Sequence, residues 1–440
     1  MPTILQFTSR RGENATSSTG SGTVRAPIQI LLVLCLLCRA ACAQTAEEAR
    51  IPDALAALPG VADAFDPLVQ DFAEQWRAAE DAKATLALTR DYGHKLWLAA
   101  KARVASGDKD DRPLYWSRLA LAQIIHDIRP RFPIFPADRD AALQALERAS
   151  RGMDDVRYPN ERRVVRVLLT GFDPFLLDRN IGQSNPSGAS VLALDGADIP
   201  FTDQHGRQQI AHIAAVVLPV RYADFDAGLV EDFLQPWLAG AQAGPHDWFE
   251  AERQRRSGQL ANVAHATPQV DMVLTTSMGH AGFELERYAG LRRSTAAPDN
   301  ANAFSGGTLD HPTLPRLRGR PMQGAEFLEI SLPTNAMHKV QAPFVLTDNR
   351  WVRVAPDIEF AAGGIGTLHG KTAVEGSGGG YLSNEVSYRA LHLRDELGVV
   401  TLPIGHLHLP PVVGYDPVKL DAILAELRAV LAASAGALAP

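Results

Sequence analysis

The sequence predicts an α/β protein, a three-layer α/β/α sandwich with a mixed, mostly parallel sheet, together with an N-terminal helical segment. Two observations lead to this fold class. From about residue 158 to residue 440, short apolar runs alternate with stretches of helical periodicity, which is typical of a sheet covered by helices on both faces. Between residues 44 and 157, apolar residues recur at helical spacing. The expected strands are residues 164–169, 210–220, 270–275, 352–355 and 399–404.

The helical segment, residues 44–157, is expected to form a packing or interaction module. Its apolar series are Phe65, Leu68, Val69, Phe72 and Trp76, and then, after Pro113, Leu119, Ile124 and Ile125. A third helix is expected from about Ala137 to Arg151. The segment carries no pattern that indicates chemistry. We therefore expect Trp76, Trp97 and Trp116 in its core and not in a ligand platform.

Helices are also expected between the strands of the α/β domain, at about residues 224–238 and 384–397. The stretch 239–269 is rich in polar and small residues and is expected to be an insertion. Asp416 and Pro417 indicate the start of a terminal helix, because aspartate caps a helix N-terminus and proline is favoured at the first helical position.

The bulk composition is that of a globular protein and argues against one class of partner. The 440 residues are 46% hydrophobic and 21% charged, and they suffice for one large α/β domain and a smaller unit. The formal net charge is -7, with acidic and basic residues interspersed. This balance gives no electrostatic reason to expect a nucleic acid as a partner.

Residues 1–43 are predicted to be a signal peptide. Arginines precede the apolar run 28–38, and the sequence Ala41-Cys42-Ala43 follows it as a small-x-small cleavage pattern. The run is short for a membrane span, so cleavage after Ala43 is favoured over an uncleaved anchor. We therefore expect a secreted or periplasmic protein with no stable membrane span after cleavage.

The cysteines of the chain are Cys35, Cys38 and Cys42, and all three lie in the predicted signal peptide. A mature protein starting after Ala43 would contain no cysteine. It would therefore have no disulfide, no thiolate metal site and no cysteine nucleophile. The sequence leaves the oligomeric state open, and a homo-oligomer is compatible with it.

Ser383 is a candidate nucleophile because it follows the glycine-rich loop Gly376–Gly380 and precedes an expected helix. Backbone N–H groups at a helix N-terminus can hold a developing oxyanion. Downstream, His406 and His408 lie at the end of an expected strand. An acyl-transfer site needs a hydroxyl, an imidazole and a carboxylate, and Ser383 and His408 could supply the first two.

Two other interpretations of these residues stay open. In the first, the glycine loop and the histidines have only structural roles. In the second, His406 and His408 form a metal pair, since residues two apart on a strand point to the same side. No third ligand stands nearby in the sequence, so we expect no metal and treat His406 as structural.

Short motifs between residue 164 and about residue 410 resemble those of the pyroglutamyl peptidase I (pyrrolidone-carboxylate peptidase) family, in the same order. Those of the first half are Gly171-Phe172-Asp173-Pro174-Phe175 (similar to GF(E/D)PF), Asn185-Pro186-Ser187 (NP(S/T)), Val217-Leu218-Pro219-Val220 (VLPV), Leu285-Glu286-Arg287-Tyr288-Ala289 (PERVA) and Pro298-Asp299-Asn300 (PDN). Those of the second half are Ile330-Ser331-Leu332-Pro333 ((S/T)LP), Gly379-Gly380-Tyr381-Leu382-Ser383-Asn384 with Tyr388 (AGxYxCNxxxY) and Leu407-His408-Leu409-Pro410 (IHVP).

The resemblance implies a catalytic triad by position. Ser383 stands at the site of the family's cysteine nucleophile, His408 at that of the general base, and Glu286 at that of the carboxylate that orients the histidine. The implied activity is hydrolysis of an N-terminal pyroglutamyl group, or of a related amide, in a peptide or small amide substrate. It requires no cofactor.

The resemblance also implies a binding pocket. Phe172 and Phe175 would flank the pyrrolidone ring, and Tyr381 and Leu382 would line the pocket near the nucleophile. Apolar walls suit a small lactam ring.

Two positions depart from the family's pattern. A thiol is partly ionised near neutral pH, whereas the hydroxyl of Ser383 needs full help from a general base. Serine does have a rationale outside the cell, where a reactive cysteine would be oxidised. Ala296 stands where the family has an arginine that assists the oxyanion; Arg292 and Arg293 lie close in the sequence, off the matching position, and are candidates to replace it. The alternative function is therefore a catalytically inactive member of the family that binds pyroglutamyl or similar peptide termini.

Overall fold

The computed structural model of the protein describes residues 44–159, 164–240 and 267–439. The expected signal peptide, residues 1–43, lies outside the described residues, as does most of the expected insertion. Both stay predictions.

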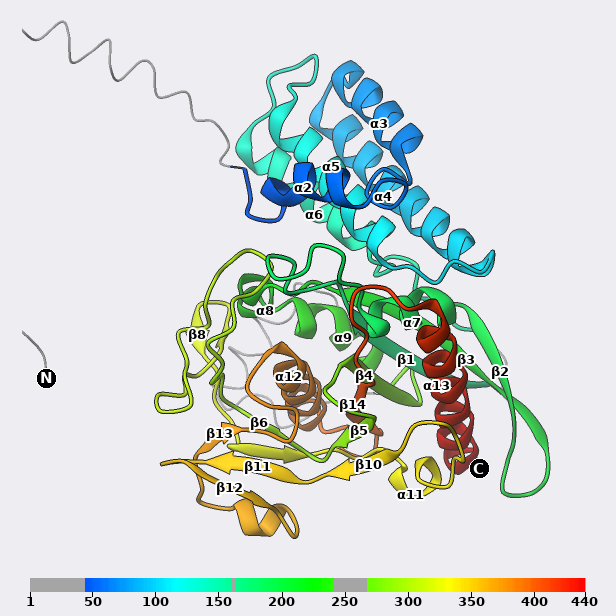
Figure 1. The fold of residues 1–440 in the computed structure, drawn as a ribbon, viewed down its shortest axis with the longest axis vertical. Helices are drawn as coiled ribbons and strands as arrows, with labels where there is room; N and C mark the ends of the chain where they lie inside the picture. Colours follow the sequence, from blue (N-terminus) through cyan, green and yellow to red (C-terminus); the bar gives the residue numbers. More distant parts are fainter. Residues whose placement is uncertain (1–43, 160–163, 241–266, 440) are drawn as a thin grey trace, which may run out of the picture. The chain divides into compact units, whose positions relative to one another are not determined.

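The first part of the described chain is helical, as the sequence predicts (Figure 1, blue to cyan). Its elements are the 3-10 helix η1 (Glu48–Arg50), α2 (Ile51–Ala57), α3 (Asp66–Ala78), α4 (Ala82–Ala105), α5 (Arg112–Asp127) and α6 (Pro136–Ser150). The three expected helices correspond to α3, α5 and α6. Trp76, Trp97 and Trp116 are fully buried, as expected for core residues.

Helix α4 has no counterpart among the helices expected from the sequence. Its buried residues include Thr85, Thr89 and Gly93 beside the apolar Leu96 and Trp97. Small and polar residues on the buried face weaken the apolar period by which a helix is recognised. Helix α4 therefore depends on its packing against α6, which its own weak apolar period does not indicate.

A seven-stranded mixed sheet lies at the centre of the α/β domain, as predicted. Its strand order is β10-β5-β14-β4-β1-β3-β2. The strands are β1 (Val164–Phe172), β2 (Ala197–Thr202), β3 (Gln208–Leu218), β4 (Met272–Met278), β5 (Phe283–Glu286), β10 (Leu346–Asn349) and β14 (Ile404–Leu409). Strands β1, β3, β4 and β14 run parallel to one another. Strand β2 is antiparallel to β3, and β5 is antiparallel to β14 but parallel to β10.

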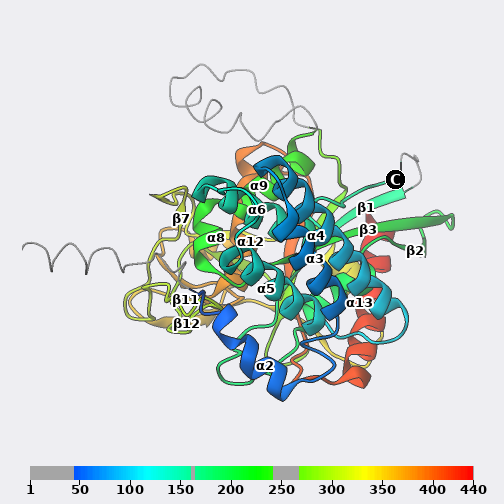
Figure 2. The ribbon, with the colours of Figure 1, turned by 90° about the horizontal axis from the view of Figure 1, so that it is seen from above.

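Helices cover both faces of this sheet and complete the predicted three layers. Helices α7 (Pro186–Leu194) and α13 (Pro417–Leu438) pack on one face. Helix α12 (Leu382–Glu396) packs on the other, with α9 (Leu229–Ala239) and α8 (Tyr222–Ala227) beside it. Figures 1 and 2 show α12 and α13 on opposite sides of the strands.

Shorter elements form small sheets beside the main one, in the strand orders β12-β11-β13, β6-β9 and β7-β8. Their bounds are β6 (Tyr288–Gly290), β7 (Arg316–Leu317), β8 (Arg320–Pro321), β9 (Phe327–Glu329), β11 (Trp351–Val354), β12 (Ile358–Ala361) and β13 (Ala373–Glu375), with α11 (Thr334–Met337) and the 3-10 helix η2 (Ile365–Leu368). The expected strand at 352–355 is therefore β11, and it lies outside the main sheet.

Two expectations about element boundaries have different outcomes. The strand expected at 399–404 starts only at Ile404, because the residues before it form the turn that follows α12. Gly398 at φ 70° ends that helix, and the apolar Val399 and Leu402 are buried within the turn. The start of α13 is as predicted, since the Asp416 side chain accepts a hydrogen bond from the Lys419 N–H at 2.9 Å.

One hydrophobic core joins the helical segment to the sheet. Phe72, Trp97 and Leu146 of the helices belong to the same buried cluster as Val167 and Leu169 of β1. The helical segment is therefore packed as part of the same folded unit. Within the described ranges, no helix is both long enough and apolar enough to cross a bilayer.

The close contact between α4 and α6 gives a first test of the fold. A Cβ atom on Gly93 would lie 2.9 Å from the Cβ of Ala149 and 3.1 Å from the carbonyl oxygen of Leu146. We expect Gly93→Leu to lower the free energy of unfolding by about 1–3 kcal/mol, because it forces the two helices apart. Exposed Ala87 on the same helix provides the control, and Ala87→Leu should change stability by less than about 0.5 kcal/mol. Urea unfolding followed by circular dichroism measures both; equal stability of the two variants would contradict the packing described.

Candidate active site

A cavity of about 620 Å³ opens at the carboxyl ends of the parallel strands. Phe172 ends β1, Met278 ends β4, and Val220 follows the end of β3; all three line the cavity. The carboxyl edge of an open α/β sheet is where such folds bind ligands. The lining is mostly apolar, and it contains no lysine or arginine among the described residues.

The structure brings the sequence-predicted site residues together. Six of them line this cavity: Phe172, Phe175, Tyr381, Leu382, Ser383 and His408. The seventh, Glu286, lies directly behind His408. Phe175 faces Tyr381 with ring centroids 6.4 Å apart, which forms an aromatic wall. Their proximity is a structural finding, whereas their roles in binding and catalysis stay predictions.

His408 and Glu286 form a buried ion pair across two neighbouring strands. His408 Nδ1 lies 2.6 Å from Glu286 Oε1, and both side chains are buried. The second carboxylate oxygen accepts a hydrogen bond from Asn349 Nδ2 at 2.8 Å. In the antiparallel β5–β14 ladder His408 is paired with Glu284, so Glu286, two residues further along β5, lies diagonally from His408 on the same face of the sheet. The imidazole is thereby fixed, and no described residue hydrogen-bonds to its other nitrogen, Nε2.

The charge of Glu286 controls the proton affinity of His408. Burial by itself would lower the pKa of the imidazole. The adjacent Glu286 carboxylate outweighs burial, so the pKa of His408 lies above its ordinary value. At a given pH, a raised pKa leaves a smaller share of the neutral imidazole that a general base requires.

His406 is held away from this chemistry. Its Nδ1 lies 2.8 Å from Thr275 Oγ1 and its Nε2 2.9 Å from Ser277 Oγ, so hydroxyl groups occupy both ring nitrogens. Burial, together with the charge of His408, lowers the pKa of His406 well below its ordinary value. These contacts support the structural interpretation of His406 and weigh against a metal pair with His408.

A different group has the spacing to hold a metal ion. Carboxylate oxygens of Glu284 and Glu286 and a nitrogen of His408 lie within 4.8 Å of one another. In this structure Glu286 instead uses its oxygens to bind His408 and Asn349. A metal ion there would have to displace these hydrogen bonds.

Ser383 lies in the first turn of α12, beside the glycine loop. Its hydroxyl donates a hydrogen bond to the carbonyl oxygen of Gly378 at 3.2 Å and makes none to His408. The side chain of Asn384 packs closely against the backbone of Gly376, where a Cβ atom would lie 2.1 Å from Asn384 Oδ1. Asn384 fastens the turn to β6 by accepting from the N–H of Gly290 at 2.8 Å and donating to its carbonyl at 2.7 Å. The first N–H groups of the helix have no acceptor within the helix and can serve an oxyanion.

The arginines near Ala296 are engaged elsewhere. Ala296 itself lines the cavity. Arg293 is buried and pairs with Glu385 at 2.6 Å, and Arg292 pairs with Glu326 at 2.8 Å. Neither arginine lines the cavity. The expectation that one of them could replace the family's arginine therefore finds no support in this arrangement.

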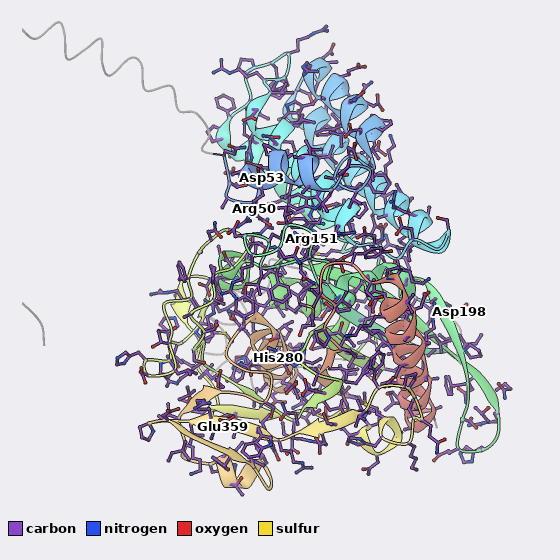
Figure 3. The ribbon with its side chains drawn as sticks, viewed as in Figure 1. Arg50, Asp53, Arg151, Asp198, His280 and Glu359 are labelled. Carbon is purple, nitrogen blue, oxygen red and sulfur yellow. The ribbon has the colours of Figure 1, made fainter. Side chains whose placement is uncertain are left out.

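Some lining residues were not found by sequence reasoning. They are Ser277, Met278, His280, Ser294, Thr295 and the loop residues Thr308, Leu309 and Asp310. His280 is labelled in Figure 3. Met278 lies three residues beyond the strand expected at 270–275, because β4 continues to Met278. The loop at Thr308 has no apolar period and no motif that would have indicated a place in the cavity.

Comparisons with other proteins give two domain models and one curated relative. The model described as "PA0049 N-terminal domain" matches residues 34–147. The model described as "PA0049, C-terminal domain" matches residues 166–247 and 349–413. The chain is also 29% identical over 426 residues to the uncharacterized protein PA0049 of Pseudomonas aeruginosa, covering 80% of this chain and 75% of that protein. Between the two matched regions lies the link from α6 to β1.

Solved structures similar to this chain include pyrrolidone carboxyl peptidases and a pyroglutamyl peptidase I. A mutant pyrrolidone carboxyl peptidase from Pyrococcus furiosus is 18% identical with a TM-score of 0.36, covering 61% of this chain and 98% of that one. The Thermococcus litoralis enzyme is 16% identical with a TM-score of 0.37, over 61% and 93% of the two chains. Pyroglutamyl peptidase I of Bacillus amyloliquefaciens is 17% identical with a TM-score of 0.35, over 62% and 98%.

The two histidines of β14 should titrate differently, because Glu286 forms a hydrogen bond with His408 and none with His406. By NMR, we expect His408 to titrate above about pH 6.5, the ordinary value for histidine, and His406 to stay neutral throughout the folded range. Glu286→Gln removes the charge that favours the imidazolium, so the His408 midpoint should fall. Asp310→Asn, a change at the cavity wall, should leave it in place. A His408 midpoint that is the same in wild type and Glu286→Gln would show that the ion pair does not control this group.

Proposed function

We propose that the protein is an exported amide hydrolase that removes an N-terminal pyroglutamyl group, or a related amide, with Ser383 as nucleophile. The observation that carries the proposal is the buried Glu286–His408 pair at the edge of an apolar cavity that Ser383 also lines. The order of motifs in the sequence supports it independently.

The proposed reaction is an acyl transfer in two steps. The Ser383 hydroxyl turns from Gly378 towards the free Nε2 of His408, gives up its proton there and attacks the amide carbonyl carbon. Backbone N–H groups at the start of α12 stabilise the oxyanion. His408 then gives the proton to the leaving amine as the C–N bond breaks. Water, activated by the same imidazole, hydrolyses the acyl-enzyme and releases pyroglutamate and free Ser383.

The cavity favours a neutral ring over a charged N-terminal residue. Phe172, Phe175, Tyr381 and Leu382 supply apolar surface around the nucleophile. No lysine or arginine is present in the described lining to pair with a free glutamate carboxylate. A lactam has no charge to desolvate, so it can be buried there at lower cost than glutamate.

A second candidate function is binding without catalysis. It is favoured by the Ser383 hydroxyl, which is hydrogen-bonded to Gly378 in place of His408, and by Ala296 at the position of the family's arginine. In this case the cavity would recognise pyroglutamyl or similar peptide termini. Both candidate functions predict the same ligand, but only the first predicts turnover.

Hydrolysis of a fluorogenic pyroglutamyl amide by the mature chain, residues 44–440, separates the two functions. We expect turnover that falls at least about 1,000-fold in Ser383→Ala and is insensitive to EDTA. A silent wild type with activity gained in Ser383→Cys would support the binding protein, since a thiol reacts where the hydroxyl does not. Turnover that survives in Ser383→Ala would contradict the proposed nucleophile.

Export is proposed on the strength of the apolar run 28–38 and the Ala41-Cys42-Ala43 pattern. When the full-length chain is expressed in a bacterium, we expect protein in the periplasmic or secreted fraction whose N-terminal sequence begins at Gln44. Protein found only in the cytoplasm with residues 1–43 intact would contradict the proposal.

A further inference from the structure

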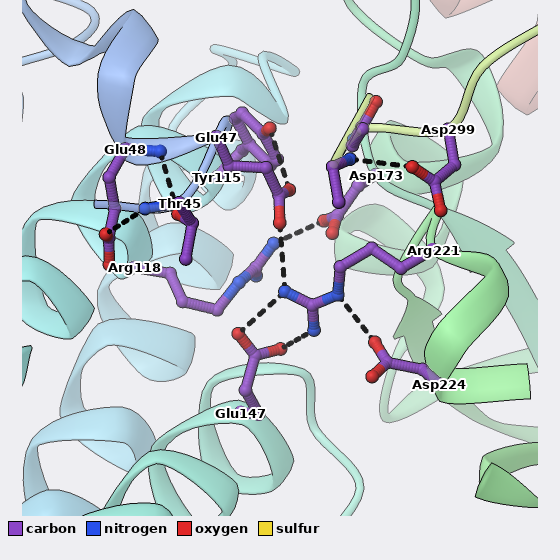
Figure 4. A network of polar contacts seen from close by, with 12 residues as sticks. Thr45, Glu47, Glu48, Tyr115, Arg118, Glu147, Asp173, Arg221, Asp224 and Asp299 are labelled. Atoms are coloured by element: carbon purple, nitrogen blue, oxygen red, sulfur yellow. Dashed lines mark hydrogen bonds and ion pairs between the residues drawn. The ribbon is translucent and has the colours of Figure 1, made fainter. Parts of the chain in front are cut away.

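One buried carboxylate connects the cavity to the helical segment. Asp173 lies between Phe172 and Phe175 in the loop after β1 and is itself almost fully buried. Its Oδ1 accepts a hydrogen bond from Arg118 Nη2 at 2.5 Å, and its Oδ2 accepts one from Arg151 Nη1 at 2.7 Å. Figure 4 shows the Arg118–Asp173 contact, and Figure 3 shows Arg151 at the junction of the two regions. Both arginines come from the helical segment, so the loop carrying the two phenylalanines is held from outside the α/β domain.

A second cavity loop is held in the same way. Arg221 follows Val220, a lining residue. Its Nη1 lies 3.0 Å from Glu47 Oε2 and its Nη2 lies 2.8 Å from Glu147 Oε2. Figure 4 draws both contacts. Glu47 and Glu147 belong to the helical segment. The contact lies one residue from the cavity wall.

The third contact involves Asn185, another lining residue. Its N–H donates to Asp111 Oδ2 at 3.0 Å, and Asp111 precedes α5. The Asn185 side chain then donates to the carbonyl oxygen of Asp173 at 2.9 Å. The loops after β1 and before α7 are thus joined to each other and to the helices.

Stability alone does not account for these buried charges. Arg118 is completely buried, yet its Nε and Nη1 have no hydrogen-bond partner among the described residues. A buried guanidinium with unused donors is unfavourable, and replacing a buried ion pair by apolar side chains is often neutral or stabilising. What Arg118 does provide is a fixed position for Asp173. Displacement of a binding group by about 1 Å can lower a rate about 100-fold.

We propose that the N-terminal helical segment is a positioning element of the site, in which Arg118 and Arg151 hold Asp173 and so set the positions of Phe172 and Phe175 in the cavity lining. Arg118 is a positioning residue, since it acts on substrate only through Asp173. The kinetic test of this inference rests on the proposed function. The inference itself concerns the geometry of the cavity.

The variant Arg118→Met of the mature chain, residues 44–440, tests this inference. It keeps the apolar volume and leaves Asp173 paired with Arg151. We expect KM for a pyroglutamyl amide to rise at least about 10-fold, with kcat changed less than about 3-fold. Arg118→Lys keeps a cation opposite Asp173 and should recover most of the lost affinity.

The matched control is Lys101→Met. Lys101 of α4 pairs with Asp195 at the end of α7, with 2.6 Å between Nζ and Oδ2, so it joins the same two regions without contacting a cavity loop. We expect its KM to equal that of wild type. Equal KM values for wild type, Arg118→Met and Lys101→Met would overturn the positioning role.

Amide hydrogen exchange gives a readout that does not depend on catalysis. Arg118→Met should speed exchange in residues 172–187 and leave β4 and β14 unchanged, whereas Lys101→Met should not affect 172–187. If the wild type fails to hydrolyse or bind the amide, the proposed function fails, while the exchange experiment still decides the positioning role. Unchanged exchange in residues 172–187 of both Arg118→Met and Asp173→Asn would overturn the inference.

Discussion

The contact between Glu286 and His408 is the interaction on which the candidate site depends. A carboxylate and an imidazole removed from water are unfavourable unless they are paired and hydrogen-bonded, and removal of one partner of a buried ion pair typically costs about 3–5 kcal/mol. The pair forms because β5 runs antiparallel beside β14. That reversal, one of two in the mixed sheet, places the carboxylate behind the imidazole while the other ring nitrogen stays free for the cavity. The proposed chemistry therefore depends on the topology of the sheet.

Much of the α/β domain follows from local sequence signals. The apolar run at Val164 forms β1, Asp416 caps α13, and the glycine loop leads into α12 as expected. The resemblance carried by the short motifs grouped the predicted site residues into one site, and they lie at or directly behind the lining of one cavity. The start of β14 was wrong by five residues, since an apolar turn and a buried strand have the same composition.

Other features depend on contacts between distant residues, which leave no period in the sequence. Helix α4 buries Thr85, Thr89 and Gly93, and the glycine lies directly against α6. The hydrogen bond between Asp173 and Arg118 joins residues that are 55 positions apart. Nothing local to either residue indicates that partnership, so sequence reasoning predicted a packing or interaction module and no contact of the helical segment with the site. The engagement of Arg293 with Glu385 was hidden for the same reason.

Identification of the residue that carries the acyl group tests the central claim most directly. The mature protein would be mixed with a slowly hydrolysed pyroglutamyl ester, quenched in acid, digested and analysed by mass spectrometry. The account predicts one peptide, containing Ser383, whose mass has increased by one pyroglutamyl group, and loss of that adduct in Ser383→Ala. An adduct on any other residue, or hydrolysis without an adduct at Ser383 in any quenched sample, would contradict it.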